Sequence, residues 1–370
     1  MKKFIQFKLF LLLYSKPDHP TPLRDAKGTL FDRHSLGFTM MEAISTLLIG
    51  SVILGFAFNG FFSMRQIFIS DKAKVDANQR LRTIFTTIGP DIQQTGEGLI
   101  SDPKLPAIEI SEQNIGSTTV KTSEIIVRKA VVPSSLNVCQ SITAGTTSIV
   151  NVIDNISTDT TCRVNDFQPE DGWPDTVKIW QGLRQNKGGS IRAYIYDGNG
   201  NGEFFNYTGE ETKDSGGTAM TPAAGTKPEK VNITTGGHTW LRDYPFGSFI
   251  YLMEERRFRV QDEKLQLIVN NSETFDITED VEKLEIKAIL QKEAGGTQYV
   301  CKKIPPTVTT DCSPNFPDPA TEYSWAQIKT IDVTAKILPG ENTNNQSTGT
   351  LTQEDLSLTQ QFFPRNRLSF

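Results

Sequence analysis

The chain has few residues of the types that build most hydrolytic and metal centres. Only three of its 370 residues are histidine, and His19 and His34 both precede Gly37. His238 is the single histidine after Gly37, which disfavours a histidine-based triad or a zinc site. No nucleophile-base pair, phosphate-binding loop or metal constellation stands out, so we do not expect an enzyme.

An excess of positive charge is also absent, with 38 Lys and Arg against 43 Asp and Glu. The formal net charge is −5, and no long basic run occurs anywhere in the sequence. The composition therefore gives no electrostatic footprint for nucleic acid, and no specific nucleic-acid partner is expected.

Cysteine occurs only four times, as Cys139, Cys162, Cys301 and Cys312, and no two of these form a C-x-x-C pair. This spacing argues against a zinc ribbon or a thioredoxin-like site and favours disulfides over four buried thiols. Sequence proximity suggests Cys139 with Cys162 and Cys301 with Cys312, although four cysteines allow three connectivities. Two bridges would place folding in an oxidising compartment such as a periplasm.

Charge is absent from the stretch Ala43 to Met64, which is over twenty residues long and can span a bilayer. A helix from Phe38 to Ile69 would measure about 48 Å, which exceeds the roughly 30 Å hydrocarbon core. Residues 1–37 carry seven Lys or Arg against three Asp, a net +4. A basic flank stays cytoplasmic, so we expect a single-pass inner-membrane protein with its C-terminal domain outside.

Beyond the membrane span the pattern becomes amphipathic. Five apolar residues recur at helical spacing, which predicts that residues 70–94 pack on a globular domain. Gly89-Pro90 should end or kink the helix, with one further turn over residues 91–94. The five apolar residues are Val75, Leu81, Ile84, Phe85 and Ile88.

Glu42 is a carboxylate near the head of the uncharged stretch, where it costs a few kcal/mol unless it is paired. An ordinary signal anchor does not account for it. The run from Gly37 to Glu42, Gly-Phe-Thr-Met-Met-Glu, resembles the cleavage site of type IV prepilins. The resemblance implies that residues 1–37 are a leader and that a prepilin peptidase cuts after Gly37 and methylates Phe38. It also implies that Glu42 neutralises the terminal amine of a neighbouring subunit.

After Pro90 the pattern changes to short alternating runs separated by turn residues, which predicts strands. With residues 38–94 as one long helix, of which 38–69 form the part for the membrane and the filament core and project beyond the membrane, this predicts an α+β fold. The helix would pack on an antiparallel sheet within an extracytoplasmic domain of residues 95–370. Strands are expected at 124–132, 177–181, 191–196, 248–254, 258–260, 264–269, 283–290 and 328–337, and exposed loops at 208–235 and 339–349.

The order of several later segments resembles PilW-type minor pilins and the related J-type pseudopilins of type II secretion. The segments that carry this resemblance are 249–254, 265–267, 277–284, 325–333 and 363–368. Residues 100–245 show no comparable likeness and are expected to hold insertions. The run Glu254-Glu255-Arg256-Arg257 is expected to be a solvated face or, alternatively, an interaction patch.

The resemblance implies a minor pilin at or near the tip of a type IV pilus, since a bulky domain suits a non-repeating cap. Its partners would be the prepilin peptidase, other major and minor pilins and, before assembly, the inner membrane. One alternative is a type II secretion pseudopilin. An alternative of another class is a single-pass membrane-anchored periplasmic binding protein.

One loop resembles the first half of an EF-hand calcium site. Asp197, Asn199, Asn201 and Glu203 alternate with glycines, so their oxygens could converge on a hard cation. The twelfth position is Thr208 instead of a bidentate glutamate. The alternative is a hairpin turn, which Asp-Gly and Asn-Gly strongly favour.

Overall fold

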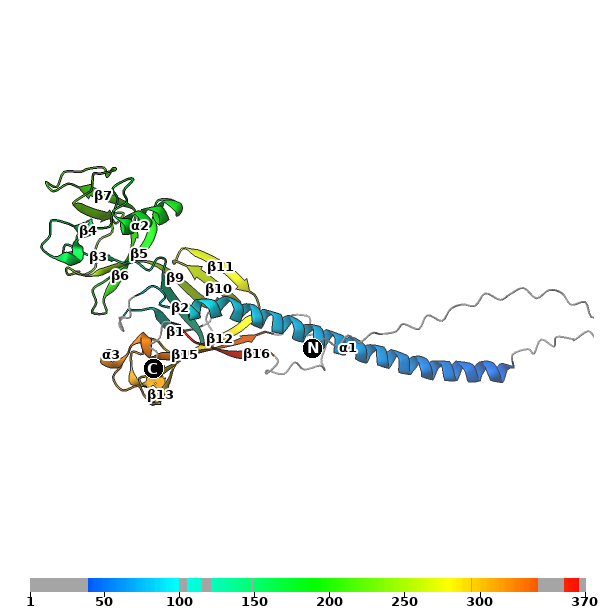
Figure 1. The fold of residues 1–370 in the computed structure, drawn as a ribbon. Helices are drawn as coiled ribbons and strands as arrows, with labels where there is room; N and C mark the ends of the chain where they lie inside the picture. Colours follow the sequence, from blue (N-terminus) through cyan, green and yellow to red (C-terminus); the bar gives the residue numbers. More distant parts are fainter. Residues whose placement is uncertain are drawn as a thin grey trace, which may run out of the picture. The chain divides into compact units, whose positions relative to one another are not determined.

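The computed structural model describes residues 39–99, 105–114, 121–147, 149–293, 295–338 and 356–365. The chain divides into one unit up to Phe61 and a second from Phe62 onward. Helix α1 (Met40–Gln93) begins in the first unit and ends in the second. The fold is α+β, with one long apolar N-terminal helix and antiparallel sheets, as the sequence predicts (Figure 1).

Three sheets make up the β structure of the second unit. The largest has the order β1-β2-β9-β10-β11, with β3 and β5 also paired to β9 and β6 paired to β5. The second has the order β14-β13-β12-β15-β16, and the third β4-β8-β7. The strands of the largest sheet are β1 (Ile108–Asn114), β2 (Lys121–Ala130), β3 (Leu136–Asn137), β5 (Ile191–Tyr196), β6 (Gly202–Tyr207), β9 (Phe249–Gln261), β10 (Lys264–Val269) and β11 (Glu273–Thr278).

The other strands and helices complete the second unit. The second sheet holds β12 (Val281–Gln291), β13 (Gln298–Cys301), β14 (Cys312–Ser313), β15 (Ile328–Ile337) and β16 (Ser357–Phe362). The third holds β4 (Val150–Asp154), β7 (Gly209–Lys213) and β8 (Lys230–Thr234). Short helices are α2 (Asp175–Asn186) and α3 (Pro319–Glu322), with single 3-10 turns at Thr160–Cys162, Thr309–Asp311 and Trp325–Gln327.

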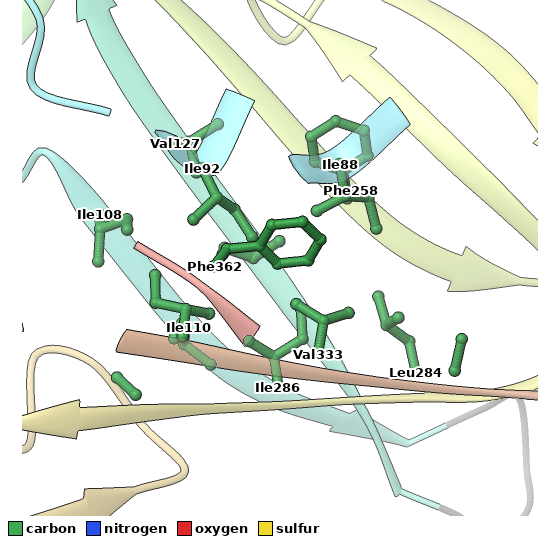
Figure 2. Packing of buried hydrophobic residues seen from close by; sticks show 14 of the residues in the cluster. Ile88, Ile92, Ile108, Ile110, Val127, Phe258, Leu284, Ile286, Val333 and Phe362 are labelled. Atoms are coloured by element: carbon green, nitrogen blue, oxygen red, sulfur yellow. The ribbon is translucent and has the colours of Figure 1, made fainter. Parts of the chain in front are cut away.

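The main core packs the amphipathic C-terminal part of α1, from Ala77 to Ile92, against the first two sheets. Ile88 and Ile92 of the helix pack with Phe258 of β9 and Phe362 of β16 (Figure 2). A fully buried isoleucine contributes roughly 1.5–3 kcal/mol of stability, so this face of the helix is held chiefly by apolar burial. The predicted amphipathic face is confirmed at Leu81, Ile84, Phe85 and Ile88, whereas Val75 is 63% exposed.

A second core lies within residues 136–252 and contains α2 and the third sheet. Strand β9 links the two cores. Its residues Ile250 and Leu252 belong to the second core, and Phe258 and Val260 belong to the main core. The sequence predicted two strands here, at 248–254 and 258–260, but the structure has one.

Two other local predictions were wrong. The segment 177–181 lies in helix α2, because Val177 and Trp180 bury one helical face three residues apart. The first three of these residues, Val-Lys-Ile, alternate in polarity as a short strand does, which led to the strand prediction. The expected loop at 208–235 contains β7 and β8, while residues 339–349 lie outside the described part of the chain.

Candidate functional site

Helix α1 begins with a reciprocal cap formed by Thr39 and Glu42. The Thr39 hydroxyl accepts a hydrogen bond from the Glu42 backbone N–H at 3.3 Å. The Glu42 carboxylate accepts hydrogen bonds from the Thr39 backbone N–H and hydroxyl, each at 3.3 Å. This is a capping box, whose signature is Thr or Ser followed three residues later by Glu or Gln. The sequence carries that signature, and sequence reasoning missed it.

Gly37 and Phe38, the predicted processing residues, lie outside the described residues. The helix that follows exposes its large apolar side chains, among them Met40 at 81%, Leu47 at 73% and Phe56 at 73%. Of the described helices, α1 is the one long and apolar enough to cross a membrane, and none of its apolar window is buried. Exposed apolar surface of this extent needs a covering partner, and lipid is one such partner.

The amphipathic C-terminal part of α1 is held against the sheets by ion pairs as well as by apolar packing. Arg256 Nη1 of β9 lies 2.8 Å from Asp91 Oδ1, and Arg80 pairs with Asp280 just before β12. At the helix end the Arg365 backbone N–H donates to the Gln93 carbonyl at 3.0 Å. These contacts fix the end of the helix on the domain.

The helix passes through Pro90 and ends at Gln93, so Gly89-Pro90 does not end it. Gln94 N–H donates to the Pro90 carbonyl at 3.0 Å, which closes the predicted further turn. A Cβ placed on Gly89 would overlap the ring of Phe362. Glycine at this position therefore lets β16 approach the helix backbone.

The charge cluster at 254–257 is not a fully solvated face, because Glu255 is buried and the other three side chains are between 26% and 34% exposed. The alternative of an interaction patch stays a prediction. The Glu255 side chain is 4% exposed and accepts from Arg128 Nε at 2.8 Å. Arg128 also pairs with Glu109 at 2.6 Å. Burial opposes the charge of Arg128, but Glu109 and Glu255 outweigh it and raise the pKa of its guanidinium. Removing one member of such a buried network is strongly destabilising because it leaves a buried charge unpaired.

The four cysteines form two disulfides, Cys139–Cys162 and Cys301–Cys312. This is the pairing that sequence proximity suggested. The first bridge connects the segment between β3 and β4 to the 3-10 turn at Thr160–Cys162. The second joins β13 to β14, where Cys301 and Cys312 are directly opposite each other.

The candidate calcium loop is the turn of the β5–β6 hairpin, in which Tyr196 pairs with Gly202. Asp197 Oδ1 accepts from the backbone N–H groups of Asn199 at 2.7 Å and Asn201 at 3.0 Å. Burial acts to raise the pKa of the Asp197 carboxyl, but the side-chain amide of Asn201, which donates to it at 2.8 Å, and these backbone hydrogen bonds outweigh burial and lower that pKa. The structure thus brings Asp197, Asn199 and Asn201 together in one turn, and Asn201 Oδ1 also accepts from Arg242 Nη1 at 2.6 Å.

Glu203 is not part of that turn. It lies on β6, and its carboxylate accepts from Tyr244 Oη at 2.9 Å and from the Leu241 backbone N–H at 3.1 Å. His238 Nε2 is also 2.9 Å from it. Within the described residues no group of three or more His, Cys, Asp or Glu side chains is placed to hold a metal. Calcium binding at the loop stays a prediction, with Glu203 committed to other partners.

No family model matches the chain, and neither a curated protein nor a solved structure matches it. The class of the protein is therefore assigned from its own fold, its long helix and its disulfides. It is an α+β protein in which one candidate membrane-spanning helix precedes a disulfide-bonded domain, an arrangement compatible with a single-pass membrane protein.

Proposed function

We propose that this chain is a minor pilin of a type IV pilus, cleaved after Gly37 and incorporated at or near the filament tip. The observation that carries the proposal is Glu42, a carboxylate in the first turn of an exposed apolar helix whose later turns pack on antiparallel sheets. The resemblance of residues 37–42 to the prepilin cleavage site gives this carboxylate its role. It pairs with the terminal amine of a neighbouring subunit once Phe38 has become the first residue.

The capping box refines this role. Before assembly Glu42 is satisfied locally by Thr39, which offsets part of the cost of a carboxylate at the membrane. On assembly a cation from a neighbouring subunit gives a stronger partner, since it adds a direct charge–charge attraction that the neutral N–H and hydroxyl of Thr39 do not supply. Cleavage between Gly37 and Phe38 leaves Thr39 in place, so the cap survives processing.

The domain supports a position at the tip. It contains two disulfides, two large cores and the 277 residues after α1, and a domain of this bulk is poorly suited to a closely repeated helical array. As a minor pilin the chain works with the prepilin peptidase and with other major and minor pilins. It resides in the inner membrane before assembly, with its domain on the periplasmic side.

Deletion of the gene tests the proposal against the related alternative, a type II secretion pseudopilin. Lost piliation or twitching, restored by the wild-type gene, supports the pilus. Intact piliation with lost secretion of exported proteins assigns the chain to the pseudopilus instead. If neither process changes, a membrane-anchored binding protein becomes the better account.

A further inference from the structure

A polar hollow of about 360 Å³ lies against the β5–β6 hairpin, and its volume falls at the lower end of the range for small-molecule sites. The lining comes from Arg192 of β5, residues 204–206 of β6, the turn 235–238 after β8, and the β10–β11 turn at Asn270-Asn271. Among the described residues no Asp or Glu lines the hollow, and Arg192 is the one lining residue with a permanent positive charge. The lining therefore suits a small anion better than a cation.

The guanidinium of Arg192 is held in place without hydrogen bonds. Its Cζ lies 3.9 Å from the centroid of the Phe204 ring, so one face of the guanidinium is covered by the aromatic ring. Within the part of the chain that the structure describes, the Arg192 side chain makes no hydrogen bond, and its ion-pair partner Glu255 lies 3.7 Å from Nη1. The side chain is 19% exposed. The N–H groups at the edge of the guanidinium plane can therefore donate to a ligand in the hollow.

Arg192 has less negative charge close to it than its neighbour Arg128. Arg128 donates to Glu109 at 2.6 Å and to Glu255 at 2.8 Å, and these carboxylates raise the pKa of its guanidinium despite burial. Burial lowers the pKa of Arg192, and the attraction of Glu255 does not offset burial together with the repulsion from Arg128 and Arg257. A mostly buried cation without a hydrogen-bonded acceptor is costly, so an anion in the hollow would stabilise Arg192.

Two asparagines supply further hydrogen-bond donors to the hollow. Asn206 is exposed and lies directly opposite Arg192 in the β5–β6 pairing. Residues in such a pair project from the same face, with their Cβ atoms about 5 Å apart. Asn270 Oδ1 accepts from the Glu255 backbone N–H at 3.0 Å, which leaves its amide nitrogen as a donor. The oxygens of one anion can accept from the guanidinium and from these amides together.

We infer that this hollow binds a small carboxylic acid through its carboxylate. A planar carboxylate matches the forked N–H edge of Arg192, and Asn206 and Asn270 donate to the same group. Its single negative charge equals the one permanent positive charge of the lining, whereas a phosphate monoester carries nearly two at pH 7. This inference does not depend on the proposed function, because a pilus tip, a pseudopilus and a membrane-anchored binding protein could all present such a site.

The test uses the full chain in a non-ionic polyoxyethylene detergent and a Tris chloride buffer, which contain no competing oxyanion. Saturation-transfer NMR is recorded for acetate, glycolate and benzoate, for their neutral amides, and for methyl phosphate and methyl sulfate. We expect saturable binding of at least one carboxylate, with its amide bound at least about tenfold more weakly. Arg192→Met keeps an aliphatic contact with Phe204 but removes the charge, and it should weaken carboxylate binding about ten- to a hundredfold.

Substitutions of the exposed Asn206 test the same site without removing a buried charge. Asn206→Asp places a negative charge opposite Arg192 and should weaken carboxylate binding about three- to tenfold. Asn206→Lys adds a positive charge at the same position and should strengthen carboxylate binding by a similar factor. Added salt should reduce both effects, because the charge at position 206 is exposed.

Arg242→Met is the matched control, since Arg242 is an exposed arginine that contacts the turn of the same hairpin through Asn201 and lies outside the lining. It should bind as the wild type does. Thermal unfolding of each variant verifies that the fold is retained. The inference is overturned if no carboxylate binds saturably, if the neutral amides bind equally well, if only methyl phosphate or methyl sulfate binds, or if folded Asn206→Asp binds carboxylate as well as the wild type.

Discussion

The carboxylate of Asp91 lies 2.8 Å from the guanidinium of Arg256 and joins the last turn of α1 to strand β9. The Asp91 side chain is 6% exposed and that of Arg256 is 34% exposed. Burial is the largest influence on Asp91 and raises the pKa of its carboxyl, while Arg256 acts against this rise. The pair therefore fixes the position of the helix end, although the ionised carboxylate is costly to bury.

The pKa of Asp91 predicts a pH-dependent effect of Asp91→Asn. A carboxyl whose pKa is raised on folding contributes stability below its unfolded value of about 3.9 and loses it as the pH rises through the folded value. Asparagine has no such dependence. The stability of Asp91→Asn relative to wild type, measured as the difference in free energy of unfolding by urea titration, should therefore increase from pH 4 to pH 7.

For Asp276→Asn we expect the opposite pH dependence of stability relative to wild type. Hydrogen bonds from Gln266 and Lys264 lower the pKa of the exposed Asp276 carboxyl, so its contribution is present above the unfolded pKa and lost in acid. Asp276→Asn should therefore be less stable than wild type at pH 7, and this difference in the free energy of unfolding should become smaller at low pH. Parallel trends for the two variants would contradict the assignment of opposite environments.

The contact between Gly89 and Phe362 predicts a non-additive pair of substitutions. Gly89→Ala should destabilise the fold by about 1–3 kcal/mol, because the new methyl overlaps the phenylalanine ring. In a Phe362→Ala background the overlap is gone, and Gly89→Ala should be neutral or stabilising by up to about 1 kcal/mol through helix propensity. A double-mutant cycle in urea measures the coupling.

Gly182→Ala in α2 is the matched control for that cycle, since nothing lies within 4 Å of the added Cβ. It should stabilise the protein by up to about 1 kcal/mol in either background. If Gly89→Ala changes the free energy of unfolding equally with and without the Phe362 ring, the close approach of that ring does not restrict the side chain at position 89.

Each disulfide should contribute about 3 kcal/mol in the loop-entropy account, because the bridges span 23 and 11 residues. Replacing both cysteines of one pair with serine, one pair at a time, should lower the urea midpoint in each case. The Cys139–Cys162 pair closes the longer loop and should show the slightly larger loss. No change in either double variant would mean that the bridges add nothing to the core packing around them.

Much of the fold followed from the sequence because period and polarity agreed locally. The bounds of β5, β10 and β15 match the expected strands, and the buried helix face at Leu81 and Ile88 follows its 3.6-residue repeat. Tertiary context explains the failure at the charge cluster. Glu255 is expected to be solvated from the sequence, but Arg128 of β2 and Arg192 of β5 lie against it in the fold.

The candidate sites were predictable to different degrees. The disulfide pairing followed from proximity along the chain, and the Thr39–Glu42 cap could have been found from its spacing. Glu203 was grouped with the loop at Asp197 on spacing alone, whereas strand geometry turns its carboxylate toward Tyr244.

Glu42 has two roles that substitution can separate. Glu42→Gln keeps a residue that serves the capping box but removes the charge, whereas Glu42→Ala removes both. If the charge pairs with a neighbouring subunit's amine, both variants should be processed normally and both should fail to enter the filament. The measurement is the amount of tagged protein in sheared filaments, and full incorporation of Glu42→Gln would reduce the residue to a helix cap.

The most direct measurement is mass spectrometry of the mature N-terminus of protein purified from its native membrane. The proposal predicts a chain that begins at Phe38 with a methylated amine and lacks residues 1–37. An intact peptide bond between Gly37 and Phe38 would contradict assignment to the pilin class and leave a membrane-anchored domain in its place.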